Sequence, residues 1–380
     1  MHKMFSWILA ALLVVSSAAI NPNANASGTS AREMASVRTV IAADDSIAIL
    51  PKSDVVAVID VSRLVNDLLP KIKNAWPDQF AKFEKDLTDG MAKAKVDIYK
   101  VKTLTIGLKL FGDVTTGAMI VEGLPLTAEM MADTISTAYK GKTLYVEKPK
   151  PAAAKTVAKG KSTAPVKGKA KAAASSEKSA LSDVSAVASN MGASLLKDKT
   201  AFVQLDEARV AIGDEAEVKA VIDALLGGPN PDSNVGSELS AALKESSSTG
   251  LFRFAVNLPD SVRQMAAGEE FLKNLAVTKM VLGTLDISDN LSLLLDAKLR
   301  TGSAEDATKL HESLAALLGL GKMMLGGNQD PTMEMLNKLL DQIKLSLQTK
   351  DVSLGLTVPR ELYETLLKPD PKAVPAKKEK

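Results

Sequence analysis

The sequence predicts an α+β protein made of two related halves. Each half is expected to contain about five mainly antiparallel strands, two hairpins plus a lead strand, with helices packed on one sheet face. Three observations support this prediction: pairs of alternating apolar segments joined by short turns, helix-start residues after them, and the same element order in both parts of the chain. The first half covers residues 44–228 and the second covers residues 250–368, with a linker at 229–249.

Each half opens with an apolar strand followed by an amphipathic helix. The segments are VVAVIDVSRLVNDLL (55–69) and LFRFAVNLPDSVRQM (251–265), and each has a polar capping residue between its strand and its helix. The first half adds a predicted helix over WPDQFAKFEKDLTDGMAKAK (76–95). This opening is the first shared landmark of the two halves.

A hairpin follows in each half, at 103–123 and at 280–299. Its two strands alternate between apolar and polar residues around a short polar turn. Gly107 matches Gly283 and Asp113 matches Asp289, both at an offset of 176 residues. Helix starts are predicted at the same offset, because Thr and Ser are favourable N-caps and acids suit the first turn: Thr127-Ala128-Glu129 and Ser303-Ala304-Glu305.

A second hairpin and a short helix close each half. AFVQLDEARVAIGD (201–214) matches KLSLQTKDVSLGL (344–356) at an offset of 142 residues, and the helices AEVKAVIDALLGG and RELYETLLK follow. The fall in offset from 176 to 142 means that the first half carries 34 extra residues between its first and its second hairpin. A Lys/Ala/Pro-rich stretch lies in that interval, so we interpret it as an insertion into a loop of the first half.

Three segments are predicted to be disordered or loosely held because they contain too few large apolar residues to form a core. They are the insertion at about 149–180, the basic tail 369–380 and the lead-in 27–43. Between Lys148 and Lys178 there are nine lysines and one acidic residue, and the stretch 368–380 adds five lysines and two acids. The remaining body therefore has a net charge of about −10.

Residues 1–26 have the layout of a signal peptide. A short basic start precedes the apolar stretch 5–20, which is shorter than the roughly 20 residues that span a bilayer. Ala24-Asn25-Ala26 supplies a small-x-small cleavage site. An uncleaved anchor is the alternative, but the sequence favours export to the periplasm or the extracellular space, with no transmembrane span after cleavage.

Composition excludes several kinds of chemistry. The chain has no cysteine, so disulfides, thiolate metal sites, cysteine nucleophiles and an acylated lipoprotein form are ruled out. Its two histidines are His2, in the expected signal peptide, and His311. No phosphate-binding loop, dinucleotide-binding motif or nucleophile elbow is present, and the glycines of Gly319-Leu-Gly321 follow a helix and indicate helix packing.

The remaining candidate residues favour structural roles. His311 is expected at a helix surface, and the acidic pairs Asp44-Asp45 and Glu269-Glu270 lack the aromatic cleft that glycosidic chemistry needs. The Asp286-Ser288-Asp289-Asn290 stretch is typical of a turn rather than a calcium loop. We therefore assign no catalytic, cofactor-binding or metal-binding residues and expect no cofactor.

The sequence predicts an exported, non-catalytic binding or scaffold protein, and no motif identifies a known family. The alternative is a carrier or chaperone of apolar ligands, lipid or peptide, that uses a methionine-rich groove between sheet and helices. The methionines concerned are Met130, Met131, Met323, Met324, Met333 and Met335. Partners are unidentified; envelope proteins or anionic polymers that bind the lysine-rich segments are the candidates, and specific nucleic-acid binding is not expected.

Overall fold

The computed structural model describes residues 45–94, 96–111, 114–132, 134–148, 200–227, 235–268, 273–326 and 331–367 of the 380-residue chain. The expected signal peptide, lead-in, insertion and basic tail lie outside these residues.

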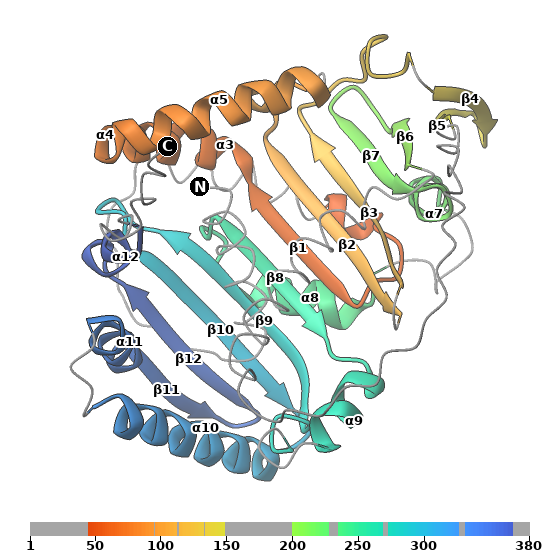
Figure 1. Cartoon of the computed structure of the whole chain (residues 1–380). Helices are drawn as coiled ribbons and strands as arrows, with labels where there is room; N and C mark the ends of the chain where they lie inside the picture. Colours follow the sequence, from red (N-terminus) through yellow and green to blue (C-terminus); the bar gives the residue numbers. More distant parts are fainter. Residues whose placement is uncertain are drawn as a thin grey trace, which may run out of the picture.

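The strands of these described residues form one twelve-stranded antiparallel sheet (Figure 1). The α+β class and the antiparallel pairing are therefore confirmed, and the strands of both expected halves lie in a single sheet. In spatial order the strands are β11 (Ile343–Gln348), β12 (Asp351–Val358), β10 (Leu293–Thr301), β9 (Thr278–Ile287), β8 (Phe252–Asn257), β1 (Val55–Asp60), β2 (Thr103–Phe111), β3 (Val114–Glu122), β7 (Arg209–Asp214), β6 (Thr200–Gln204), β5 (Lys142–Glu147) and β4 (Thr134–Tyr139).

Helices connect these strands at the places where the sequence has amphipathic segments. The first part of the chain has α3 (Val61–Arg63), the π-helical turn η2 (Leu64–Leu68), α4 (Leu69–Ala75), α5 (Pro77–Ala94), the 3-10 turn η3 (Ile98–Lys100) and α7 (Glu215–Leu225). The rest has α8 (Ser237–Glu245), α9 (Asp260–Gly268), α10 (Ala304–Leu325), α11 (Pro331–Asp341) and α12 (Arg360–Leu367). Residues 45–48 are also helical.

Helices cover both faces of the sheet, which corrects the prediction that they pack on one face. Neighbouring residues of β7 show this, because Ala211 belongs to one apolar cluster while Val210 and Ile212 belong to another. The sequence of β1 indicates burial on both faces, because VVAVI is apolar at every position. Such continuous runs are typical of strands that are covered on both sides.

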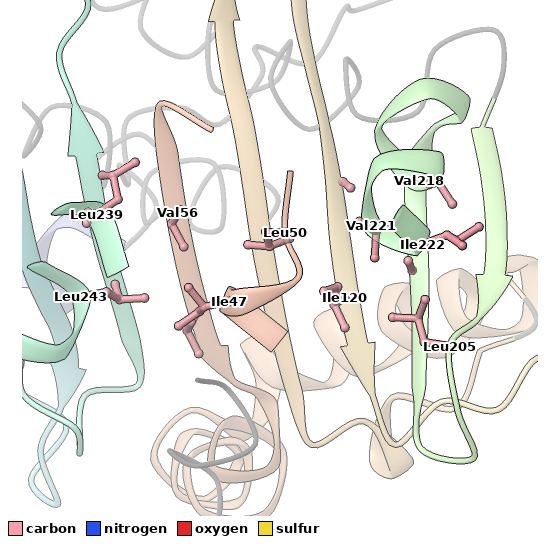
Figure 2. Packing of buried hydrophobic residues seen from close by; sticks show 14 of the residues in the cluster. Ile47, Leu50, Val56, Ile120, Leu205, Val218, Val221, Ile222, Leu239 and Leu243 are labelled. Carbon is pink, nitrogen blue, oxygen red and sulfur yellow. The ribbon is translucent and has the colours of Figure 1, made fainter. Parts of the chain in front are cut away.

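One face is covered by α7, α8 and the chain near residue 47 (Figure 2). Val221 and Ile222 of α7, Leu243 of α8, and Ile47 and Leu50 are all almost completely buried. Helix α7 packs on β3, β6 and β7, and α8 packs on β1, β8 and β9. The apolar cluster beneath them therefore runs without a break from β5 and β6 to β9. We call this side of the sheet face A.

The opposite side, face B, is covered in two places. The chain from α3 to η3 packs over β2, β3 and β7 through Val65, Leu69 and Phe80. Helix α10 packs over β10 and β12 through Ala307, Leu310 and Leu314. Figure 1 shows α5 along one side of the molecule and α10 along the other.

Most predicted elements are present, and two differ from the prediction. The Ser303 side chain accepts a hydrogen bond from the Asp306 backbone N–H and caps α10, as expected. After Thr127 the chain makes only a turn, and the hairpin β4–β5 follows instead of a helix. The expected linker 229–249 contains α8, whose buried face was overlooked because it is only nine residues long.

Gly107 and Gly283, which the sequence matched to each other, differ by one residue in their position in the sheet. Gly107 pairs with Val56, which belongs to the face A cluster, whereas Gly283 pairs with Phe254, which belongs to a cluster on face B. A shift of one residue in a strand moves a side chain to the other face of the sheet. The Gly112-Asp113 turn lies outside the described residues.

Candidate binding surfaces

A recess on face A lies beside the C-terminal end of α8. It has a volume of about 250 Å³ and a floor formed by β9, β10 and β12. Its polar lining comes from Glu245, Ser247, Thr284, Asp296, Lys298 and Ser353. The recess forms where α8 ends, next to the part of face A over β10 and β12 that carries polar residues.

The floor of the recess contains both buried and charged polar groups. Ser353 is only 1% exposed, and its hydroxyl has no hydrogen-bond partner among the described residues. Lys298 lies directly opposite Ser353 in the pairing of β10 with β12. Burial raises the pKa of Asp296, which stands two residues before Lys298 on the same face.

An ion-pair cluster fixes one side of the recess. The Arg300 guanidinium donates to Asp351 at 2.9 and 3.0 Å and to Glu245 at 2.7 and 3.1 Å. The hydrogen bonds to Asp351 and to Glu245 raise the pKa of Arg300. Bidentate pairs of this kind are geometrically specific, so Arg300 joins the end of α8 to β10 and β12.

The free edge of strand β4 is a second candidate surface. Among the strands of the described residues, β4 is the last at this end of the sheet, and the four side chains from Ile135 to Ala138 are exposed. The strand TISTAY contains no charged residue and no proline, which are the usual means of blocking an edge.

The turn of the β4–β5 hairpin is tied to α7. The Tyr139 hydroxyl donates to Asp223 at 3.2 Å, and Lys140 pairs with the same carboxylate at 2.8 Å. Lys219 lies 5.6 Å from the centre of the Tyr139 ring. Lys140 and Gly141 both have positive φ, as a two-residue hairpin turn requires. The hairpin is therefore held in place, while no strand of the described residues pairs with its outer edge.

The methionines do not gather in one groove. Met130 packs against the face B cluster under α5, and Met335 is buried in α11. Met323 and Met324 are each 73% exposed at the C-terminal end of α10. Leu320 on α10 and Leu336 on α11 are exposed as well, so this end of the helix pair has an apolar surface.

The other sequence candidates are placed in structural settings. His311 is half-buried on α10, and Gly321 faces Leu340 of α11, consistent with helix packing. Asp286 pairs with Arg63 at 2.7 Å and Asp289 with Lys71 at 2.5 Å.

The Asn290 side chain accepts a hydrogen bond from the Ser292 backbone N–H, so this stretch uses its polar groups to build a turn. Asp44 and the pair Glu269-Glu270 lie outside the described residues.

The described part of the chain contains neither a metal-binding cluster nor a membrane-spanning helix. No group of three or more histidine, aspartate or glutamate side chains in these residues is placed to hold a metal ion. None of the described helices has the length and apolar character needed to cross a membrane.

The recess and the β4 edge could not be identified from sequence. Asp296, Lys298 and Arg300 alternate with apolar residues and resemble an ordinary solvent-facing strand, and the wall of the recess comes from α8, about fifty residues earlier. The lack of charge in TISTAY was the one available signal for the edge.

Comparisons with known proteins gave structural matches only. No family model and no curated protein matches the sequence. Solved structures of a protein named TP0453 match at 10% identity. Crystal form I covers 85% of this chain and 96% of its own, with a TM-score of 0.37; form III covers 84% and 96%, with a TM-score of 0.38.

Proposed function

We propose that this chain is an exported, non-catalytic binding or scaffold protein that takes up an extended segment of a partner protein at the edge of β4. The observation that carries the proposal is the exposed and uncharged β4 edge at the end of the sheet. A partner strand added there gains backbone hydrogen bonds, and the exposed side chains supply specificity. The three-part layout of residues 1–26 supports export.

The anchoring of the hairpin favours this use of the edge. Because Tyr139 and Lys140 hold the turn to Asp223, little ordering is required when a partner binds. The opposite edge, β11, is less available, since α10 contacts it and the exposed Lys344 lies on it. Lysine on an edge strand disfavours pairing with another chain.

The predicted two related halves form part of the proposal. Outward from the β1–β8 pair, one side reads β2, β3, β7, β6 and the other reads β9, β10, β12, β11. The β4–β5 hairpin is inserted after β3, and the helices α10 and α11 are inserted after β10. We infer that related halves have acquired different insertions at the same point, and that these insertions carry the contact surfaces.

Site-specific photo-crosslinking in the host tests the β4 proposal. A photoreactive residue at Ser136 should form a discrete adduct with one partner protein, and the same residue at Gln348 on the opposite edge is the control. Ile135→Lys together with Thr137→Lys should abolish the adduct, whereas Leu347→Lys should not. An adduct that survives the β4 substitutions, or none at Ser136, would remove β4 as the docking strand.

Carriage of an apolar ligand is the second candidate, favoured by the exposed side chains of Leu320, Met323, Met324 and Leu336. Protein purified from its host and extracted with organic solvent should then yield a bound lipid or apolar peptide. The Met323→Gln, Met324→Gln double variant should yield several-fold less. Extracts from both proteins that contain no such compound would eliminate this candidate.

A further inference from the structure

The outer edge of β4 has a hydrogen-bonding pattern that its hairpin turn determines. Tyr139 and Lys142 flank the two-residue turn, so they form the first hydrogen-bonded pair of the β4–β5 ladder. Hydrogen-bonded and non-hydrogen-bonded pairs alternate along such a ladder. Every second residue before Tyr139 therefore bonds to β5, whereas the backbone groups of Thr134, Ser136 and Ala138 point away from it.

Two of these three residues offer both of their outward backbone groups to an added strand. The Thr134 N–H already donates to the backbone oxygen of Met131 at 3.1 Å. No strand of the described residues pairs with Ser136 or Ala138 on this side. The edge therefore presents two donors and two acceptors, on residues that stand two positions apart.

We propose that the strand which pairs with this edge is β4 of a second copy of the chain, an inference that rests on the proposed use of β4 as the docking strand. Two copies related by a two-fold axis pair in the antiparallel sense, as neighbouring strands of this sheet do. An axis at Thr137 places Ser136 opposite Ala138 of the second copy. Each such pair exchanges two hydrogen bonds, so the outward groups of Ser136 and Ala138 are all satisfied.

The neighbouring registers of the two copies satisfy fewer groups. With the axis at Ser136, Ala138 lies opposite Thr134 of the second copy, whose N–H is already bonded to Met131. With the axis at Ala138, Ser136 lies opposite Lys140, which belongs to the turn. The hydrogen-bonding pattern therefore selects the register that is centred on Thr137.

The side chains of β4 are complementary to each other in this register. Tyr139 packs on the face A cluster, so Ile135 and Thr137 lie on the same face of the sheet. Thr137 lies opposite Thr137 of the second copy, and Ile135 lies opposite Tyr139. Pairs of threonines and pairs of an aromatic with a β-branched residue are both favourable when directly opposite. Ile135, which is 53% exposed in the single chain, thus gains an apolar partner.

Charge and size also permit the pairing. The positions 135–139 contain no charged side chain, so no like charges meet across the two copies. On the other face of the sheet, the small side chains of Ser136 and Ala138 lie opposite each other and leave room for the backbones to approach. The paired segment is short, so the dimer is expected to be weak and to depend on protein concentration.

Disulfide trapping of the purified chain tests the register. The chain has no cysteine, so a single introduced thiol reports its own contacts. Thr137→Cys places two thiols on the axis, with Cα atoms about 4.5 Å apart, within the range that a disulfide spans. Mild oxidation should therefore give a covalent dimer several-fold faster than it does for Leu347→Cys on β11. Ile135→Cys should behave like that control, because its two copies are roughly 13 Å apart along the strands.

Sedimentation at increasing protein concentration tests the dimer without a cross-link. The mass of the wild type should rise toward that of a dimer. Thr137→Lys places two ammonium groups opposite each other and should keep the chain monomeric, whereas Leu347→Lys should associate as the wild type does. The proposal is overturned if Thr137→Cys gives no more covalent dimer than Leu347→Cys, or if Thr137→Lys leaves self-association unchanged.

Photo-crosslinking at Ser136 in the host separates this inference from the proposed function. An adduct that contains only this chain, at twice its mass, supports the second copy as the occupant. An adduct with a different protein overturns the second copy and leaves β4 as a docking strand. The absence of any adduct removes both.

Discussion

Asp60 connects strand β1 to helix α3 at the level of a single side chain. It is the last residue of β1, and its carboxylate accepts a hydrogen bond from the Arg63 backbone N–H at 2.8 Å. Burial raises the pKa of this carboxyl, although the hydrogen bond from Arg63 and the charge of that residue act in the opposite direction. The cap is therefore favourable, while the charge it carries is costly.

Substitution of Asp60 separates these two effects. Asp60→Asn keeps a capping oxygen and removes the charge, whereas Asp60→Ala also removes the cap and should cost about 1 kcal/mol of unfolding free energy. The pKa of Asp60 is higher in the folded state than in the unfolded state, so the native state binds more protons. The wild type therefore loses stability as the pH rises through the range between these two pKa values.

The free energy of unfolding of Asp60→Asn, relative to wild type, should therefore increase between about pH 3 and about pH 7. Urea denaturation at several pH values measures this difference. A relative stability that falls with rising pH would show that the ion pairing of Asp60 outweighs its desolvation.

Single residues also show which structural features could be predicted from the sequence and which could not. The alternation of apolar and polar residues predicted the positions of the strands, and the prediction that Ser303 caps α10 is confirmed. The match of Gly107 to Gly283 failed because glycine shows no preference for a sheet face, so nothing in the sequence fixes the register to within one residue. Lys298 and Ser353 could not be paired in advance because their proximity depends on that register.

At the scale of elements, α8 shows how a short helix can be essential to the core. It is nine residues long, with Leu239, Ala242 and Leu243 buried against β1, β8 and β9. Leu243→Ala should lower the free energy of unfolding by about 2–5 kcal/mol, the cost of deleting buried methyl groups and leaving a cavity.

A matched control for this substitution exists at the end of α7. Leu226 is 51% exposed, and Leu226→Ala should change the free energy of unfolding by no more than about 0.5 kcal/mol. Chemical denaturation of both variants measures the contrast. Equal effects of the two substitutions would mean that residues 237–245 behave as the linker that the sequence suggested.

The hairpin β4–β5 and the helix α8 were missed for opposite reasons. The exposed strand TISTAY has a weak apolar pattern because it contributes little to the core, and Thr127 resembled a helix cap. Helix α8 has a clear apolar face that is too short to stand out next to turn residues. Edge elements and short helices depend on tertiary contacts, which local sequence does not encode.

At the scale of the whole molecule, contacts join distant parts of the chain. Arg63 donates to the backbone oxygen of Thr249 at 2.5 Å and pairs with Asp286. The Trp76 indole N–H donates to Glu364 of α12 at 3.0 Å, and the Arg360 guanidinium lies 4.9 Å from the centre of the Trp76 ring. Helix α12 is thus held against Trp76, at the junction of α4 and α5.

These contacts and the continuous sheet predict one cooperative unfolding transition. In a Trp7→Phe background, Trp76 is the only remaining tryptophan of the chain and reports on the contact with α12. Its fluorescence and the far-UV circular dichroism should give coincident midpoints in urea. Glu364→Ala should shift the emission spectrum while leaving a single transition. Two separated midpoints would mean that the parts of the sheet on either side of β1 and β8 unfold independently.

The position of β1 has a consequence for chain synthesis. Strand β1 is the first strand of the described residues, yet it lies between β2 and β8, and β8 is made roughly 190 residues later. At a synthesis rate of about 5–20 residues per second, the nascent chain keeps that side of β1 unpaired for roughly 10–40 s. An unpaired strand is a template for aggregation. We therefore expect the emerging chain to need protection from aggregation at β1 until β8 has left the ribosome.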